Sequence, residues 1–317
     1  MNTPTFLPVN EPAAAPRQVP SALRSPRVLF SLLILALFVI LAVFAPQISP
    51  ADPTRMNPGK GNLKPAWLRA DDSIDGYWFG SDRWGRDIFS RLIYGSRASI
   101  FLALTAAPLA ALIGILIGVT AGYTGGWFET LLMRFADIFS AFPAILFSVL
   151  MTLILRNQPI GQVMNGLLTL AIAFAAIAWV GLARLLRSVV LEIKQRPFVE
   201  AARALGASHF YTIRRHILPN IMRLTAAWVV NAIPQVILLE AGLGYLGVEI
   251  VKATEGDEFR VTSWGGLFLE GRSLIHTNPF IVLAPTLCVL LISLSFSFLA
   301  EYLNQRLSRE QNTLDST

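Results

Sequence analysis

Six long apolar stretches constrain the fold of this chain more than any other feature of its sequence. A helix needs about 20 apolar residues to cross the hydrocarbon core of a bilayer, and each stretch reaches or approaches that length. The third helix can begin as early as residue 128, and the fifth can run on to about residue 248. The sequence therefore predicts an all-α membrane protein with six transmembrane helices, over residues 28–44, 100–120, 138–155, 167–183, 224–239 and 280–300.

The composition argues against a typical soluble enzyme. Of the 317 residues, 54% are hydrophobic and only 15% are charged, whereas soluble domains carry about 25% charged residues. Six membrane helices leave too little polar chain for a separate catalytic domain. The single cysteine, Cys288, excludes an intrachain disulfide and lies in an apolar run, which predicts a buried structural thiol.

The first apolar stretch has two interpretations. Arg17, Arg24 and Arg27 precede it, as basic residues precede the apolar part of a signal peptide. The apolar part of a signal peptide is usually shorter, about 7–15 residues. We therefore expect a retained anchor helix, with a cleaved signal peptide as the alternative.

The spans predict five regions and an orientation. With a cytoplasmic N-terminus, 14 basic residues lie inside and 12 outside, and eight of those 12 fall in one long polar loop. The positive-inside rule does not apply to long loops. Without that loop, 14 basic residues lie inside and 4 outside. We expect a cytoplasmic tail (1–27), a first transmembrane helix (28–45), an extracytoplasmic loop (46–98), a core with five transmembrane helices and a cytoplasmic loop at 184–223 (99–303) and a C-terminal tail (304–317).

The loop 184–223 is the basic part of the chain. It holds eight basic and two acidic residues, which accounts for the entire formal net charge of +6. The rest of the chain is neutral, so the charge points to a local partner beneath the inner membrane surface and not to nucleic acid. An amphipathic segment held by anionic lipid is one interpretation of this loop.

Residues 197–220 predict two short helices within this basic loop. Pro197 suits the first position of a helix, and Gly206 is a natural stop. Ser208 can cap a second helix that runs through Leu218 and ends at Pro219. We expect this helix–turn–helix to lie on the membrane surface, with one apolar face and one basic face. The apolar face would hold Phe198, Ala201, Ala202, Leu205, Phe210, Ile213 and Ile217, and the basic face Arg203, Arg214 and Arg215.

The same segment resembles the EAA loop of ABC importer permeases. The resemblance rests on Glu200-Ala201-Ala202, then Gly206, then Ile217-Leu218-Pro219. It implies that the loop docks into a cleft of an ATPase subunit. Glu200 and Gly206 would then set the geometry of the loop, and Arg203, Arg214 and Arg215 would make polar contacts with the ATPase.

Further motifs narrow the resemblance to permeases of the dipeptide, oligopeptide and nickel type. Residues 79–87 (FGSDRWGRD) are similar to an F-G-T-D-x-x-G-R-D motif of that group, and residues 240–247 (EAGLGYLG) to its E-A-x-L-x-x-L-G run. The resemblance covers roughly residues 25 to 307. Two features depart from it, an acidic insert at 249–262 and Ala300-Glu301 in place of Gly-Asp. Because the insert lies on the expected outer face, the solute class stays open.

The resemblance carries expectations for fold, function and partners. It implies a type I ABC importer permease fold, like that of methionine importers, in the bacterial inner membrane. The function implied is ATP-driven import of dipeptides or oligopeptides, with nickel chelates or glutathione as alternatives. The partners would be a second permease subunit, forming a heterodimer, two cytoplasmic ABC ATPase subunits and an extracytoplasmic solute-binding protein. ATP and Mg would bind to the ATPase subunits, so this chain would hold no cofactor and be no enzyme.

Four polar residues within the spans are candidates for the translocation pathway. Ionisable groups inside a membrane are functional hypotheses by default, although each of these could instead pair within the bundle. Asp137 shares a helix face with Arg134 and can pair with it. The four candidates are Asp137, Asn231, Gln235 and Glu240.

Two other classes of protein compete with this interpretation. An ion-coupled secondary transporter would use intramembrane carboxylates, but only Asp137 and Glu240 are available and no inverted repeat is visible. A membrane-integral enzyme would need a catalytic constellation, and we find neither a nucleophile–base pair nor a metal-ligand spacing. Gly242, Gly244 and Gly247 spell G-x-G-x-x-G, but at the end of a membrane helix they indicate close packing and not a dinucleotide site.

Overall fold

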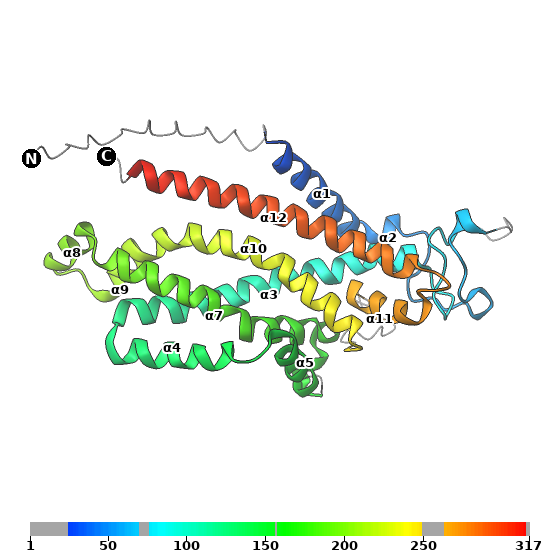
Figure 1. Cartoon of the computed structure of the whole chain (residues 1–317), viewed down its shortest axis with the longest axis horizontal. Coiled ribbons are helices and arrows are strands. Elements are labelled where there is room, and N and C mark those ends of the chain that lie inside the picture. Colours follow the sequence, from blue (N-terminus) through cyan, green and yellow to red (C-terminus); the bar gives the residue numbers. More distant parts are fainter. Residues whose placement is uncertain (1–24, 70–75, 156, 249–262, 315–317) are drawn as a thin grey trace, which may run out of the picture.

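The computed structural model describes residues 25–69, 76–155, 157–248 and 263–314, and over these residues the chain folds into an elongated bundle of helices (Figure 1). Within these described ranges, five helices are long and apolar enough to cross a membrane. The first is α1, and the fourth is a continuous run of helix from His209 through α10. The long helices are α1 (Pro26–Val43), α3 (Ile88–Thr124), α7 (Leu167–Lys194), α10 (Leu218–Tyr245) and α12 (Phe280–Leu314).

The third expected span, residues 138–155, is not one straight helix. It consists of α4 (Gly126–Ser140) and α5 (Ala144–Leu155), which meet at an angle of 89°. Pro143 lies at the bend and explains it, because proline donates no backbone hydrogen bond and disfavours helical geometry in the residue before it. Counted as one span, the bent pair brings the total to six, which confirms the predicted fold class.

Several helices extend beyond the apolar stretches that predicted them. The helix α3 begins at Ile88 and not near residue 100, because the Asp87 side chain caps it by accepting a hydrogen bond from the Ser90 N–H at 2.8 Å. Likewise α7 runs past residue 183 to Lys194. Hydropathy marks only the part of a helix that lies in lipid, so it predicts the spans and not their polar ends.

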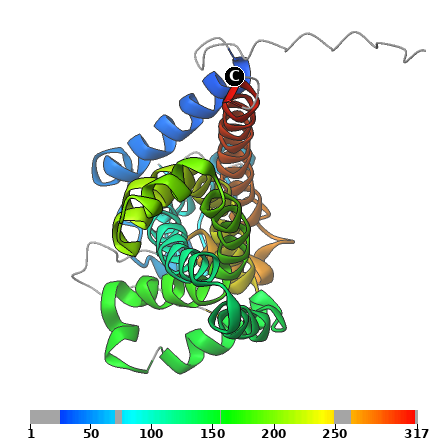
Figure 2. The same ribbon diagram turned by 90° about the vertical axis from the view of Figure 1, so that its left-hand side faces the viewer.

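The bundle has three layers. The views in Figures 1 and 2 place α3, α7 and α10 in the middle, α1 and α12 on one side, and α4 with α5 on the other. The short helix α8 and the end of α12 lie at one end of the bundle, and α11 at the other (Figure 1). We call these the α8 end and the α11 end. The remaining elements are α2 (Ala45–Ile48), η2 (Pro58–Lys60), η3 (Ala66–Leu68), α6 (Pro159–Gln162), η4 (Val163–Gly166), α8 (Pro197–Ala204), α9 (His209–Thr212), the π turn η5 (Ile213–Ile217) and α11 (Trp264–Leu274).

A stripe of glycines lets α3 approach α7 closely. Gly114, Gly118 and Gly122 recur at every fourth residue and therefore share one face of α3. A Cβ atom on Gly118 would lie 2.6 Å from the carbonyl oxygen of Ala183, and one on Gly122 would lie 2.7 Å from that of Arg187. Small residues at such spacing allow membrane helices to pack backbone to backbone.

This contact predicts opposite effects of the same substitution at two glycines. Gly118→Ala should destabilise the protein by about 1–3 kcal/mol, because the added methyl group overpacks the α3–α7 contact. Gly181→Ala, on α7 with open space around it, should stabilise it by about 0.5–1 kcal/mol through higher helix propensity. Thermal unfolding in detergent, followed by tryptophan fluorescence, measures both, and equal effects would contradict the packing described here.

Candidate functional site

The helix α8 is built as the sequence predicts. Pro197 is its first residue, and Gly206 follows it with a φ of +88°, which side-chain-bearing residues rarely adopt. The Gly206 N–H donates to the Arg203 carbonyl at 3.0 Å, and the Ala207 N–H donates to the Ala202 carbonyl at 3.1 Å. These two hydrogen bonds form a Schellman motif, so Gly206 fixes the direction in which the chain leaves α8.

The helix that follows does not end at Pro219. The Ser208 hydroxyl caps it at the expected place, accepting from the Tyr211 N–H at 3.2 Å. Helix then continues without a break from His209 to Tyr245. The chain passes Pro219 by means of the π turn, in which the Leu218 N–H donates to the Ile213 carbonyl. The prediction of a stop at Pro219 is therefore wrong, because the π turn before it keeps the chain helical.

One buried side chain anchors α8 to the bundle, while its larger apolar groups point outward. Val199 is fully buried in a cluster with Ile217 of the π turn. In contrast, 89% of Leu205 and 72% of Phe210 are exposed, and Phe198 is exposed as well. The expected apolar face is thus divided: Ile213 and Ile217 pack into this cluster, whereas Phe198, Leu205 and Phe210 do not. We call residues 196–217 the α8 cap.

The remaining predicted residues of the coupling loop divide into an exposed and a buried set. Glu200 lies in the first turn of α8, where a negative charge interacts favourably with the helix dipole. Arg203, Arg214 and Arg215 are exposed, as is Ala201. Ala202 and Leu218 are half-buried, Pro219 is exposed and Ile217 is buried.

Polar contacts tie the α8 cap to α3. The Tyr123 hydroxyl lies 2.8 Å from Nδ1 of His209, and the Lys194 ammonium donates to the Tyr123 carbonyl at 3.0 Å. Beside them, Arg187 of α7 pairs with Glu129 of α4. The cap is therefore fixed to the ends of three long helices, α3, α7 and α10.

The four predicted pathway residues do not gather at one place. Asp137 pairs with Arg184 of α7 at 2.8 Å, and not with Arg134 as expected. Asn231 and Gln235 lie one turn apart on α10, and both are exposed. Glu240 is only 3% exposed, and its Oε1 accepts a hydrogen bond from the Gly265 N–H at 3.4 Å.

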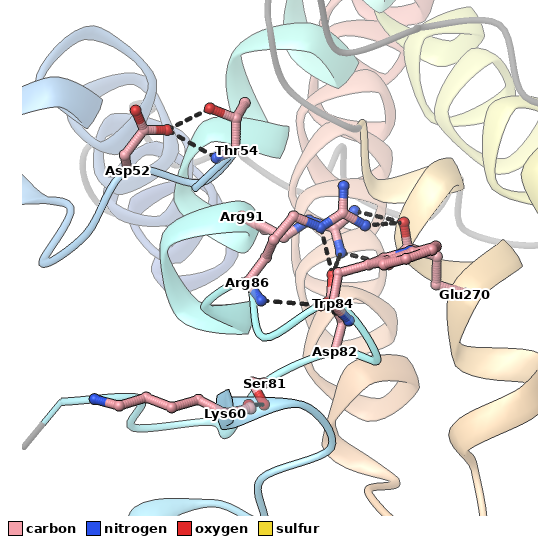
Figure 3. Close-up of polar contacts among 9 residues, drawn as sticks. All are labelled: Asp52, Thr54, Lys60, Ser81, Asp82, Trp84, Arg86, Arg91 and Glu270. Carbon is pink, nitrogen blue, oxygen red and sulfur yellow. Dashed lines mark hydrogen bonds and ion pairs between the residues drawn. The ribbon is translucent and has the colours of Figure 1, made fainter. Parts of the chain in front are cut away.

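A buried cluster of four charges lies at the α11 end, and the sequence analysis did not recognise it (Figure 3). Asp82 accepts hydrogen bonds from Arg86 and Arg91, both at 2.6 Å. Glu270 of α11 accepts from Arg86 at 2.7 Å and from Arg91 at 2.5 and 2.9 Å. We call these four residues the arginine–carboxylate cluster. Three of them lie within residues 79–91, but no local pattern indicates the fourth, which is about 180 residues further along the chain.

The charges of the cluster support one another. Burial alone would raise the pKa of Glu270, but the positive charges and hydrogen bonds of Arg91 and Arg86 lower it to about 2. Burial alone would likewise lower the pKa of Arg86, yet Glu270 and Asp82 raise it. Glu270 and Arg86 therefore stay charged near neutral pH, and the cluster fastens α11 to the start of α3.

The fold and these sites define a multi-pass, all-helical membrane protein with an exposed basic cap at one end and a loop fastened by buried charges at the other. The sequence profile of the binding-protein-dependent transport system inner membrane components matches residues 114–309. A second profile, the N-terminal TM domain of oligopeptide transport permease C, matches residues 23–65. The chain belongs to the family of binding-protein-dependent transport system inner membrane components.

Relatives match most of the chain. The dipeptide transport system permease protein of Alkalihalophilus pseudofirmus is 31% identical, over 87% of this chain and 83% of the relative. The oligopeptide transport system permease protein of Haemophilus influenzae is 32% identical, over 87% and 82%. The glutathione transport system permease protein of Escherichia coli is 31% identical, over 87% and 84%. These matches confirm the resemblance to ABC importer permeases.

The arginine–carboxylate cluster predicts a dependence of stability on acid pH. The pKa of Glu270 is about 2 in the folded protein and near 4.5 when the side chain is free. Its contribution to folding is therefore complete above about pH 4.5 and is lost as the pH falls toward 2. Glu270→Gln should lower stability at pH 7 by about 3–5 kcal/mol, because it leaves two buried arginines with one carboxylate.

Thermal unfolding in detergent at several values between pH 3 and 7 measures this effect. The matched control is Glu301→Gln, because Glu301 is largely exposed and lies 3.7 Å from the exposed Arg27. We expect the control to change stability little at any pH. Wild type and Glu270→Gln with parallel pH profiles would show that Glu270 is not the group responsible.

Proposed function

We propose that this chain is the transmembrane permease subunit of an ATP-driven importer of dipeptides and oligopeptides. The names of the dipeptide and oligopeptide relatives support this solute class. The observation that carries the mechanism is the α8 cap, which is continuous through His209–Tyr245 with a membrane-spanning helix. A force applied to the cap would act directly on that helix.

The chemistry of the α8 cap fits a protein partner. Leu205 and Phe210 are apolar and exposed, and the same cap carries three exposed arginines, Arg203, Arg214 and Arg215. Apolar anchors with a charged rim are typical of protein interfaces. The partner we propose is an ATPase subunit, with ATP and Mg bound there. Closure of two ATPases would pull the caps and switch the spans between inward-open and outward-open states.

The exposed polar residues of α10 support a second permease subunit. Asn231 and Gln235 share one face of a membrane span, and polar side chains in membrane helices usually face other helices or a water-filled pathway. A second, different permease against this face would form the translocation pathway between the two chains. Asp137 and Glu240 remain further candidates for that pathway.

The sidedness follows from the same assignment. We place the α8 end in the cytoplasm, together with the tails 1–27 and 304–317, on the inner membrane of a bacterium. The loop 46–98 and the insert 249–262 then face outward, toward a solute-binding protein. The insert lies outside the described residues.

Glutathione is the second candidate solute, favoured by the Escherichia coli relative. Nickel chelates are the third candidate solute, which the sequence resemblance implies. Uptake of radiolabelled dipeptides, tripeptides, glutathione and chelated nickel, compared in cells with and without this gene, separates the three. We expect the dipeptides and tripeptides to depend on the gene.

Copurification tests the assembly. The tagged chain, purified from its native membrane in mild detergent, should bring along two ATPase subunits and a second permease. A chain that purifies alone and still drives uptake would be a secondary transporter, and the proposal would fail.

Gly206→Val tests the α8 cap. A β-branched residue strains a φ of +88° by about 1–2 kcal/mol, so the Schellman turn should open and Leu205 should leave its position. We expect uptake to fall by about tenfold or more while the protein stays in the membrane. Gly76→Val is the matched control, because Gly76 has a φ of +78° and open space around it but lies toward the α11 end. Equal uptake by both variants would argue against the cap as the coupling element.

A further inference from the structure

We propose that Glu240 is a positioning residue that fixes the N-terminus of α11 to α10. The α11 end would then move as one body with the helix that begins in the α8 cap. The inference deepens the proposed function and rests on it, because it explains how a pull on the cap reaches the opposite end of the bundle.

The first step is the contact between the Glu240 carboxylate and α11. Glu240 is buried, and its Oε1 accepts from the Gly265 N–H at 3.4 Å. The Ser99 and Ser263 hydroxyls lie against the same carboxylate. Gly265 is in the first turn of α11, where backbone N–H groups have no partner within the helix. The Glu240 side chain of α10 therefore supplies an acceptor oxygen to one of the N–H groups that have no partner within α11.

The second step is the close approach of the two backbones at the same place. A Cβ atom on Gly244 would lie 2.0 Å from the Gly265 carbonyl oxygen, and a Cβ atom on Gly265 would lie 2.6 Å from that of Glu240. Further along α11, Arg272 donates to the Tyr245 carbonyl at 3.0 Å. The two helices therefore meet over the last turns of α10, backbone to backbone at Gly244 and Gly265 and through the Arg272 side chain at Tyr245.

The third step leads from α11 to the rest of the α11 end. The Trp264 N–H donates to the Ser99 hydroxyl at 3.3 Å, and its indole N–H donates to the Leu92 carbonyl at 3.1 Å. Glu270 joins α11 to Arg86 and Arg91 through the arginine–carboxylate cluster (Figure 3). A displacement of α10 is thus passed through α11 to the loop that precedes α3.

The burial of Glu240 and its hydrogen bond with Gly265 favour a positioning role over contact with the solute. Asn231 and Gln235 of the same helix are exposed, whereas Glu240 faces α11. A positioning role needs an acceptor oxygen at this site. An ion-coupling role needs the negative charge, and the two roles therefore predict different results for an amide.

Three variants of Glu240 in the complete importer, reconstituted in nanodiscs and proteoliposomes, separate these roles. Glu240→Gln keeps an oxygen that can accept from Gly265, so uptake of a radiolabelled dipeptide and tripeptide mixture should stay within about threefold of wild type. Glu240→Ala and Glu240→Leu remove it, so the maximal uptake rate should fall by about tenfold or more. The concentration of solute-loaded binding protein at half-maximal rate should not change.

Hydrogen exchange provides a readout that does not depend on the solute. Peptides covering residues 263–274 should exchange about tenfold faster in Glu240→Ala than in wild type. Peptides from α7 and copurification of the ATPases should be unchanged. Glu301→Ala, which removes a largely exposed carboxylate on α12, should leave both uptake and exchange as in wild type.

Two results would overturn the inference. One is Glu240→Ala with wild-type exchange in α11. The other is Glu240→Gln as inactive as Glu240→Ala while α11 keeps its protection, which would assign Glu240 to ion or solute contact. A wild-type assembly that recovers no ATPase or imports no peptide would instead defeat the proposed function, and the exchange of α11 would still decide the role of Glu240.

Discussion

The need to satisfy every backbone hydrogen bond inside a bilayer is the constraint on which this structure depends. Lipid offers neither donors nor acceptors, so a span must remain helical or be protected where it breaks. Two prolines, which donate no backbone hydrogen bond, show how the chain meets this requirement. At Pro143 the chain bends by 89° between α4 and α5. At Pro219 the chain stays helical by widening into a π turn. The first solution breaks a span in two, and the second keeps the α8 cap continuous with α10.

The two ends of the bundle use arginine in different ways. At the α11 end, Arg86 and Arg91 are buried and pair with two carboxylates, which makes the cluster electrically neutral and rigid. At the α8 end, Arg203, Arg214 and Arg215 are exposed. Buried charges are costly unless they are paired, so the first set is suited to holding one geometry. The second set is free to meet a partner.

The sequence predicted the spans well because a membrane helix is apolar over about 20 residues, whether its side chains face lipid or other helices. It also placed α8 and its glycine stop correctly, since Pro197 and Gly206 act through local backbone geometry. It missed the arginine–carboxylate cluster because Glu270 is brought to Arg91 only by folding. It predicted an apolar face on α8 that includes Phe198 and Leu205, but periodicity did not identify Val199 as the α8 side chain that meets the core.

The π turn has a consequence for the whole of α10. It inserts one extra residue between α9 and α10, and each residue turns a helix by about 100°. The polar stripe of Asn231 and Gln235 therefore lies at a rotation about the helix axis that an uninterrupted 3.6-residue repeat from His209 would not give. The direction in which α10 presents these two amide side chains therefore depends on the π turn at Ile213–Ile217, several turns away.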